Sequence, residues 1–87
     1  MESIKLEVKN RNRTYGIITW KLNQDFEIKT LFGNSKTVNI QFMDKVYSNR
    51  KVDYKYRRIS FGKKRMEKVK NDFIILKMEK GNLRVTQ

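Results

Sequence analysis

The sequence predicts a mostly-β fold, either a small antiparallel barrel or a strongly bent sheet of roughly five to seven short strands. The chain has no Ala or Pro but contains eight Ile, six Val, five Thr, five Phe and four Tyr. Ala is the best helix former, whereas β-branched and aromatic side chains suit a pleated sheet. Several segments alternate apolar and polar residues between short turn-forming stretches. The 87 residues, 1–87, suffice for one small basic β-domain with a modest core.

The first 22 residues predict two strands, over 3–9 and 14–22. Every second residue in each is apolar and is expected to face the core: Ile4, Leu6 and Val8 in the first, and Ile18, Trp20 and Leu22 in the second. Residues 10–13 are expected to form a polar turn. Gly16 indicates a bulge or the close approach of another backbone. Trp20 is expected in the core, and the alternative for its ring is a base-stacking platform.

Residues 26–30 and 37–44 predict a hairpin closed by Gly33, Asn34 and Ser35. Its inward residues would be Phe26, Ile28 and Thr30 in the first strand, and Val38, Ile40 and Phe42 in the second. Residues 44–49 are expected to form a connection to the next strand.

Residues 51–57 predict that next strand. Its core-facing positions hold Val52, Tyr54 and Tyr56. The alternation then breaks, because its continuation would turn Ile59 and Phe61 outward. A bulge near Arg57 and Arg58 would shift the register by one residue and return both apolar residues to the core.

Residues 63–71 are the part of the chain where a short helix is expected. Met66, Val69 and Phe73 recur there at spacings of three and four residues, which is the helical period. The alternative for this segment is a long basic loop.

The C-terminal residues predict two further strands. Residues 73–79 are apolar on both faces, which is typical of a central strand. Gly81 and Asn82 predict a tight turn, followed by a short last strand over 83–85.

The chain is strongly basic, with 21 Lys and Arg against nine Asp and Glu and a net charge of +12. Residues 1–44 carry seven Lys or Arg and five Asp or Glu, a net +2, whereas residues 45–87 carry fourteen and four, a net +10. Codon bias towards A and T would enrich Lys, Asn and Ile but would not deplete the acids. Such a field attracts nucleic acid, an acidic protein or an anionic membrane surface.

Residues 47–65 concentrate this charge and interleave it with aromatic rings. Cations that neutralise phosphates beside rings that stack on bases are typical of nucleic-acid-binding surfaces. The expected contacts are Arg50, Lys51, Tyr54, Lys55, Tyr56, Arg57, Arg58, Lys63, Lys64 and Arg65. Secondary contacts are expected from Arg11 and Arg13. The alternatives are a core position for Tyr54 and Tyr56, beside Val52, and a merely solvated face for the cations.

The composition argues against catalysis and metal binding. Without Cys or His the chain lacks the commonest metal ligands, the commonest general base and any thiol nucleophile. Its nine acids are scattered, so we expect no enzyme, no catalytic residue, no metal and no cofactor; the catalytic alternative is a metal-free ribonuclease using Arg, Tyr and Glu. No signal peptide is evident, and the longest apolar run, 73–76, is far too short for a membrane span, which predicts a cytoplasmic protein.

These observations together predict a non-catalytic nucleic-acid-binding protein that uses residues 50–65. Binding would depend mainly on phosphate contacts and would have limited sequence specificity. The alternative is a protein-binding module or inhibitor that docks on an acidic partner protein, since the same cations can meet carboxylates. The choices between DNA and RNA and between single and double strands, the oligomeric state and any regulatory role are left open.

Overall fold

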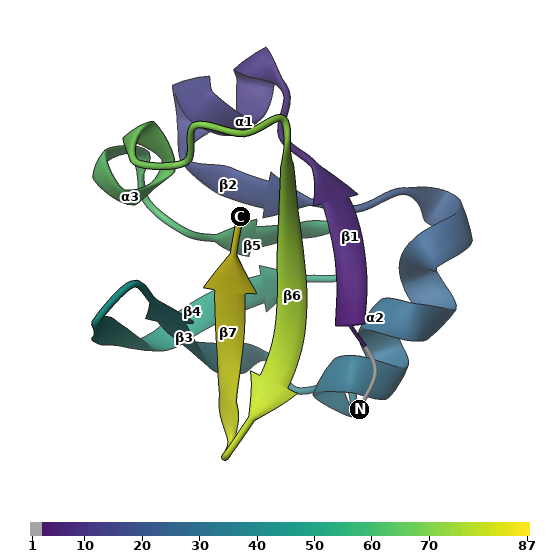
Figure 1. The fold of residues 1–87 in the computed structure, drawn as a ribbon. Helices are drawn as coiled ribbons and strands as arrows, with labels where there is room; N and C mark the ends of the chain where they lie inside the picture. The colour runs from purple at the N-terminus through teal and green to yellow at the C-terminus, as the bar shows by residue number, and fades with distance from the viewer. Residues whose placement is uncertain (1–2) are drawn as a thin grey trace.

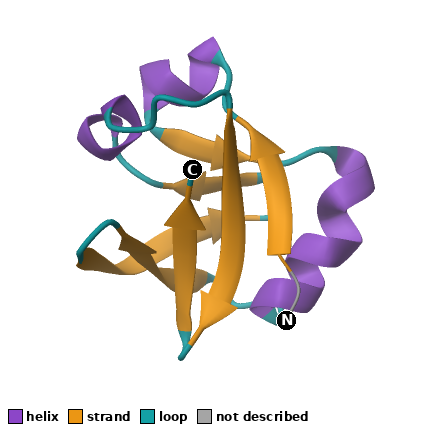
Figure 2. Ribbon diagram, in the orientation of Figure 1, coloured by secondary structure: helices purple, strands orange, loops and turns teal. Residues whose placement is uncertain are grey.

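Seven strands form one strongly curved, nearly closed sheet in the computed structural model, which describes residues 3–87 (Figure 1). In chain order the elements are β1 (Ser3–Glu7), α1 (Asn10–Tyr15), β2 (Ile17–Thr19), a 3₁₀ helix η1 (Leu22–Gln24), α2 (Asp25–Phe32), β3 (Thr37–Phe42), β4 (Lys45–Asp53), β5 (Arg58–Ser60), α3 (Lys63–Glu67), β6 (Phe73–Glu79) and β7 (Asn82–Thr86). The helices lie on the outside of the strands (Figure 2). The predicted mostly-β, barrel-like fold is confirmed.

The strand order is β1-β6-β7-β3-β4-β5-β2, which brings the middle of the chain against its last strand. Neighbouring strands pair antiparallel, except that β3 and β7 are parallel. β1 and β2 occupy the two ends of this order, and no ladder joins them within residues 3–87. We call the opening between β1 and β2 the seam.

The interior of the barrel is apolar because alternate residues of the strands point into it. The rings of Phe42 and Phe61 meet edge to face there, with centroids 5.1 Å apart. Burial of side chains of this size stabilises a fold by about 1.5–3 kcal/mol each, so this interior is the main source of stability. The strand residues buried in it include Ile4, Leu6, Ile18, Val38, Ile40, Phe42, Val52, Ile59, Ile74, Leu76, Leu83 and Val85.

The predicted hairpin of residues 26–30 with 37–44 is wrong, because residues 25–32 form helix α2. Ile28 and Phe32, one helical turn apart, are buried, whereas Phe26 is 81% exposed. The apolar alternation was therefore weaker evidence than the four-residue spacing of the two buried residues. Gly33 ends the helix with a φ of 58°. The second predicted strand does exist as β3, but it pairs with β4 and β7.

The predicted turn at residues 10–13 is also wrong, because α1 covers these residues. Gly16 ends α1 with a φ of 65°, and the strand predicted over 14–22 is reduced to β2. Ile18 and Trp20 face the core as expected, but Leu22 lies in η1 and is 71% exposed. The expected close approach at Gly16 is present: an added Cβ would lie 2.3 Å from the backbone nitrogen of Lys63.

Strand β4 differs from its prediction at both ends. Residues 45–49 belong to the strand rather than to a connection, and the strand ends at Asp53 rather than at residue 57. Its register shifts opposite Asn39, whose Oδ1 accepts a hydrogen bond from the backbone of Asn49. A tight turn over 54–57, with Arg57 at a φ of 54°, replaces the predicted bulge and still returns Ile59 to the core.

The predicted C-terminal elements are confirmed, but the predicted place of Phe73 on the helical face is wrong. The short helix expected within 63–71 is α3, and Met66 and Val69 anchor it by complete burial. Phe73 does not share this face, because it begins β6 and is 43% exposed. β6 is a central strand between β1 and β7, and the turn at Gly81 leads into β7 as expected.

Candidate functional site

Asn12 closes one end of the seam. Its side chain is 1% exposed, and its Oδ1 accepts a 2.7 Å hydrogen bond from the backbone of Lys9. Its Nδ2 donates to the backbone oxygen of Ile17 and to Oγ1 of Thr19, both at 2.9 Å. An amide suits this position because it offers an acceptor and two donors. Asn12 therefore joins the segment that follows β1 to strand β2, where no strand ladder does so.

Polar contacts bridge the other end of the seam, from Lys21 to Glu7 and from Gln24 to Lys5. Lys21 Nζ lies 2.8 Å from Glu7 Oε1, and Lys9 Nζ lies 3.8 Å from Glu7 Oε2. Gln24 Nε2 donates to the backbone oxygen of Lys5 at 3.1 Å. The hydrogen bond from Lys21, together with the charges of Lys21 and Lys9, lowers the pKa of Glu7.

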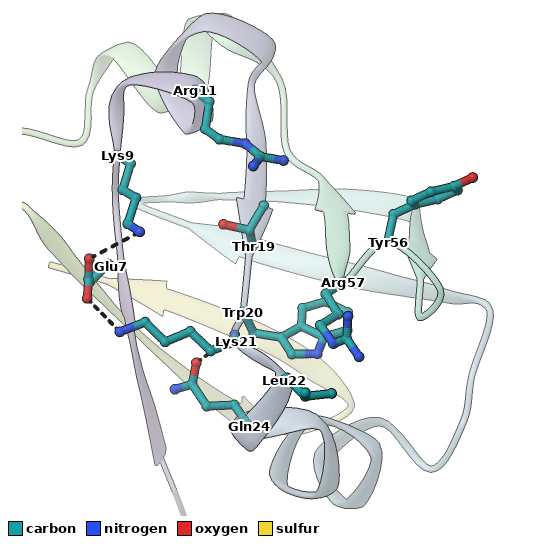
Figure 3. A pocket seen from close by; sticks show the side chains of 10 residues that line it. All are labelled: Glu7, Lys9, Arg11, Thr19, Trp20, Lys21, Leu22, Gln24, Tyr56 and Arg57. Carbon is teal, nitrogen blue, oxygen red and sulfur yellow. Dashed lines mark hydrogen bonds and ion pairs between the residues drawn. The ribbon is translucent and has the colours of Figure 1, made fainter.

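A pocket of about 310 Å³ lies between these two bridges (Figure 3). We call it the seam pocket, and its lining residues are Glu7, Lys9, Arg11, Thr19, Trp20, Lys21, Leu22, Gln24, Tyr56 and Arg57. Arg11 reaches it from α1 and Lys21 from the opposite side (Figure 3). Four cations and one carboxylate line this pocket, so it favours anions.

Asp25 holds the β4–β5 turn against the start of α2. Arg57 donates to both oxygens of Asp25, with Nε at 2.9 Å and Nη2 at 3.1 Å, and the indole nitrogen of Trp20 donates to Oδ1 at 2.7 Å. These hydrogen bonds, that of Arg57 foremost, lower the pKa of Asp25. The guanidinium of Arg57 thus lines the seam pocket while paired to a carboxylate.

Tyr56 is the exposed ring of the β4–β5 turn. It is 60% exposed and stands at the rim of the seam pocket. The guanidinium carbon of Arg58 lies 5.1 Å from the ring centroid, and Lys55 Nζ lies 5.5 Å from it. Arg58 also approaches Asp53 at 3.9 Å, which is a loose ion pair. Tyr56 is therefore an exposed aromatic surface among cations.

A smaller depression, of about 210 Å³, lies beside β5 and its neighbouring strands. Its residues are Ile17, Lys51, Asp53, Arg58 and Ser60. Arg58 lines this depression and also contacts the Tyr56 ring, which lines the seam pocket. Lys51 forms no side-chain hydrogen bond or ion pair within residues 3–87.

Three other arginines expected at the site form bonds within the chain. Arg13 donates to the backbone oxygens of Val69 and Asn71, and Arg50 donates to the oxygens of Ser60. Arg65 donates to the backbone oxygen of Phe61, and its guanidinium lies 4.2 Å from the ring centroid of Tyr47. Arg13 thus joins segments more than 50 positions apart, whereas Arg50 and Arg65 bond to residues ten and four positions away.

The two tyrosines of the predicted site have different environments. Tyr54 packs against the core, meets Trp20 edge to face with centroids 6.2 Å apart, and donates its hydroxyl to the backbone oxygen of Ser35. Burial raises its pKa. A position against the core was the alternative to nucleic-acid contact for both tyrosines. Tyr54 occupies such a position, and Tyr56 does not.

The fold divides the remaining predicted residues between two places. Lys51, Lys55, Tyr56, Arg57 and Arg58 lie around the β4–β5 turn, and Arg11 joins them from α1 through the seam pocket. Lys63 and Lys64 are exposed on α3, at the other end of β5 (Figure 1). Lys9, Lys21 and Leu22 also line the seam pocket but were not predicted. Only the tertiary arrangement of β1 and β2 brings them to the pocket, and no local motif indicates it.

No group of three or more Asp or Glu within residues 3–87 is arranged to hold a metal ion. None of the helices in this part of the chain combines the length and the apolar composition that a membrane crossing requires. No protein-family model matches the chain, and no curated protein or solved structure matches it either.

Proposed function

We propose that this chain binds nucleic acid without catalysis, through the surface around the β4–β5 turn. The observation that carries the proposal is the exposed Tyr56 ring beside Lys55 and Arg58, at a pocket that Arg11 also lines. Cations bind phosphates, and an exposed ring offers a stacking surface to any base, which gives affinity with limited sequence preference.

The distribution of acids supports the proposal. Four carboxylates, those of Glu7, Asp25, Asp53 and Glu79, already pair with Lys or Arg of the chain. Within residues 3–87, the side chains of Arg11, Lys51 and Lys55 have no carboxylate partner. The excess of Lys and Arg behind the net charge of +12 therefore includes exposed cations, such as these three, that a polyanion can reach.

Charge removal beside Tyr56 tests the proposal. The double variant Lys51→Gln/Lys55→Gln should reduce the slope of log affinity against log salt by about 1.4 for a single strand and about 1.8 for a duplex, if both cations contact phosphates. The control Lys29→Gln/Lys80→Gln removes the same charge from α2 and from the β6–β7 turn, and should leave the slope nearly unchanged. Equal slopes for the two double variants would place the contacts elsewhere.

A second outcome concerns the wild-type chain. A chain whose function is to bind an acidic protein would also use exposed cations. Such a chain would fail to bind nucleic acid even at low salt. That result would refute the proposal, and capture of a defined acidic partner would then become the next experiment.

A further inference from the structure

The seam pocket is a concave site in which cations and exposed side chains from several elements meet. Its volume of about 310 Å³ lies at the lower end of the range, about 300–1,000 Å³, that small-ligand pockets span. It is lined by side chains from β1, α1, β2, η1 and the β4–β5 turn, which the bridges of Asn12 and Glu7 hold in place. The pocket is therefore built into the barrel rather than formed by one loop.

Arg11 is the cation of this pocket best placed to receive a new anion. Lys21 and Lys9 already contact Glu7, and Arg57 is paired with Asp25. The guanidinium of Arg11 forms no hydrogen bond or ion pair within residues 3–87. A guanidinium binds phosphate through two parallel hydrogen bonds, which makes a phosphate group a suitable partner for it.

Two exposed apolar side chains lie beside these cations. Leu22 is 71% exposed and Tyr56 is 60% exposed, and both line the pocket (Figure 3). A flat base can cover such surfaces only when it is unstacked from a duplex. Phosphate-binding and base-binding surfaces thus occur together in a pocket that lies in the size range of small-ligand sites.

We infer that the seam pocket holds one unpaired nucleotide of a single strand, with its phosphate on Arg11 and its base against Tyr56 and Leu22. This inference rests on the proposed function and narrows it: single-stranded nucleic acid binds more tightly than a duplex of equal length. The surrounding cations, Lys51 and Lys55 among them, then contact the neighbouring phosphates.

Trp20 reports on this pocket directly, because it is the only Trp of the chain and it lines the pocket while being 6% exposed. An unlabelled single-stranded oligonucleotide should change the Trp20 emission at the same concentration at which a labelled copy gains anisotropy. Arg11→Gln should weaken single-strand affinity about tenfold. Tyr56→Leu, which keeps apolar bulk but removes the flat ring, should weaken it at least about fivefold.

Controls separate the pocket from general charge. Arg84→Gln removes one guanidinium from β7, away from the seam, and should change single-strand affinity by less than about twofold. The fold of each variant is checked by far-UV circular dichroism. Arg11 and Tyr56 are both exposed, and neither side chain forms a hydrogen bond within residues 3–87, so both variants are expected to fold.

The possible outcomes separate this inference from the proposed function. Two results would overturn the seam-pocket inference and leave the proposed function standing. In the first, the wild-type chain binds a single strand but its Trp20 emission does not change. In the second, Arg11→Gln and Arg84→Gln weaken single-strand binding equally. Tighter binding of duplex than of single strands would overturn the inference in the same way. No binding of either form would refute both.

Discussion

Asn12 is the residue whose replacement should most clearly show how the barrel is held at its seam. Its buried side chain forms three hydrogen bonds, to the backbone of Lys9, to the backbone of Ile17 and to Thr19. Each such bond contributes roughly 0.5–1.5 kcal/mol net, and more where a buried partner is left unsatisfied. Asn12→Ala should therefore lower the free energy of unfolding by about 2–4 kcal/mol.

This loss is large for a chain of 87 residues, whose total stability is expected to be roughly 4–13 kcal/mol. The melting temperature should fall by about 8–32 °C, since 1 kcal/mol corresponds to about 4–8 °C in a domain of this size. Urea unfolding followed by Trp20 emission measures the loss of free energy of unfolding. The slope of this free energy against urea concentration should stay the same, because the surface exposed on unfolding is unchanged. Asn12→Asp keeps the size but loses both donors, so it should be at least as damaging.

Asn10 provides the matched control on the same helix. Its side chain is exposed and forms no hydrogen bond within residues 3–87, so Asn10→Ala should stay within about 0.5 kcal/mol of the wild-type stability. If Asn12→Ala lost less than about 1 kcal/mol, or no more than Asn10→Ala, the seam would not depend on this amide.

Three further perturbations test other parts of the structure. Gly16→Ala would place a Cβ 2.3 Å from the backbone of α3, and it should destabilise the fold far more than Gly33→Ala. The Cβ of Gly33→Ala would meet no atom within 4 Å, so that variant should lose only about 1–2 kcal/mol of stability, for its left-handed φ alone, as measured by thermal unfolding. Similar losses in the two variants would contradict the close packing at Gly16. The pKa of Asp25 is lowered below its ordinary 3.8, so its ion pair with Arg57 should stabilise the fold above about pH 3.8 and be lost as the pH falls through the folded-state pKa. The melting temperature should therefore fall less steeply with decreasing pH in Asp25→Asn than in the wild-type chain. An equally steep fall in both chains at acid pH would refute this. Arg13→Gln should lower stability by about 1–3 kcal/mol through its lost carbonyl contacts while leaving the salt dependence of nucleic-acid binding unchanged; a reduced salt slope would show that Arg13 contacts phosphate instead.

The fold class could be predicted because it depends on local periodicity and composition. The alternating residues of β1 and β3 face the core as their spacing requires, and the helical spacing of Met66 and Val69 marks α3. Helix α2 was missed because Phe26, Ile28 and Thr30 also alternate, and only the tertiary packing of Ile28 and Phe32 decides between the two periods. The parallel pairing of β3 with β7 joins segments about half the chain apart, and no local pattern predicts it.

The candidate site could be predicted only as a basic, aromatic-rich segment. Guanidiniums that bind carbonyls and carboxylates of the chain have the same sequence signature as those that bind phosphate. Arg50, Arg57 and Arg65 are engaged by Ser60, Asp25 and Phe61, partners that lie four to 32 positions away and carry no distinctive motif. Likewise, alternation placed Tyr54 and Tyr56 on one face, but the tight turn after β4 separates them into a core ring and an exposed ring.

Fluorescence anisotropy of labelled single-stranded RNA, single-stranded DNA and duplex DNA, titrated with the wild-type chain at several salt concentrations, tests the proposed function most directly. We expect dissociation constants of about 1 μM or tighter at low salt, single strands bound more tightly than duplex, and a log–log salt slope of about −3.5 or steeper, which corresponds to about five phosphate contacts. Absence of binding at low salt, or affinity that does not change with salt, would contradict the proposal that exposed cations around Tyr56 bind nucleic acid.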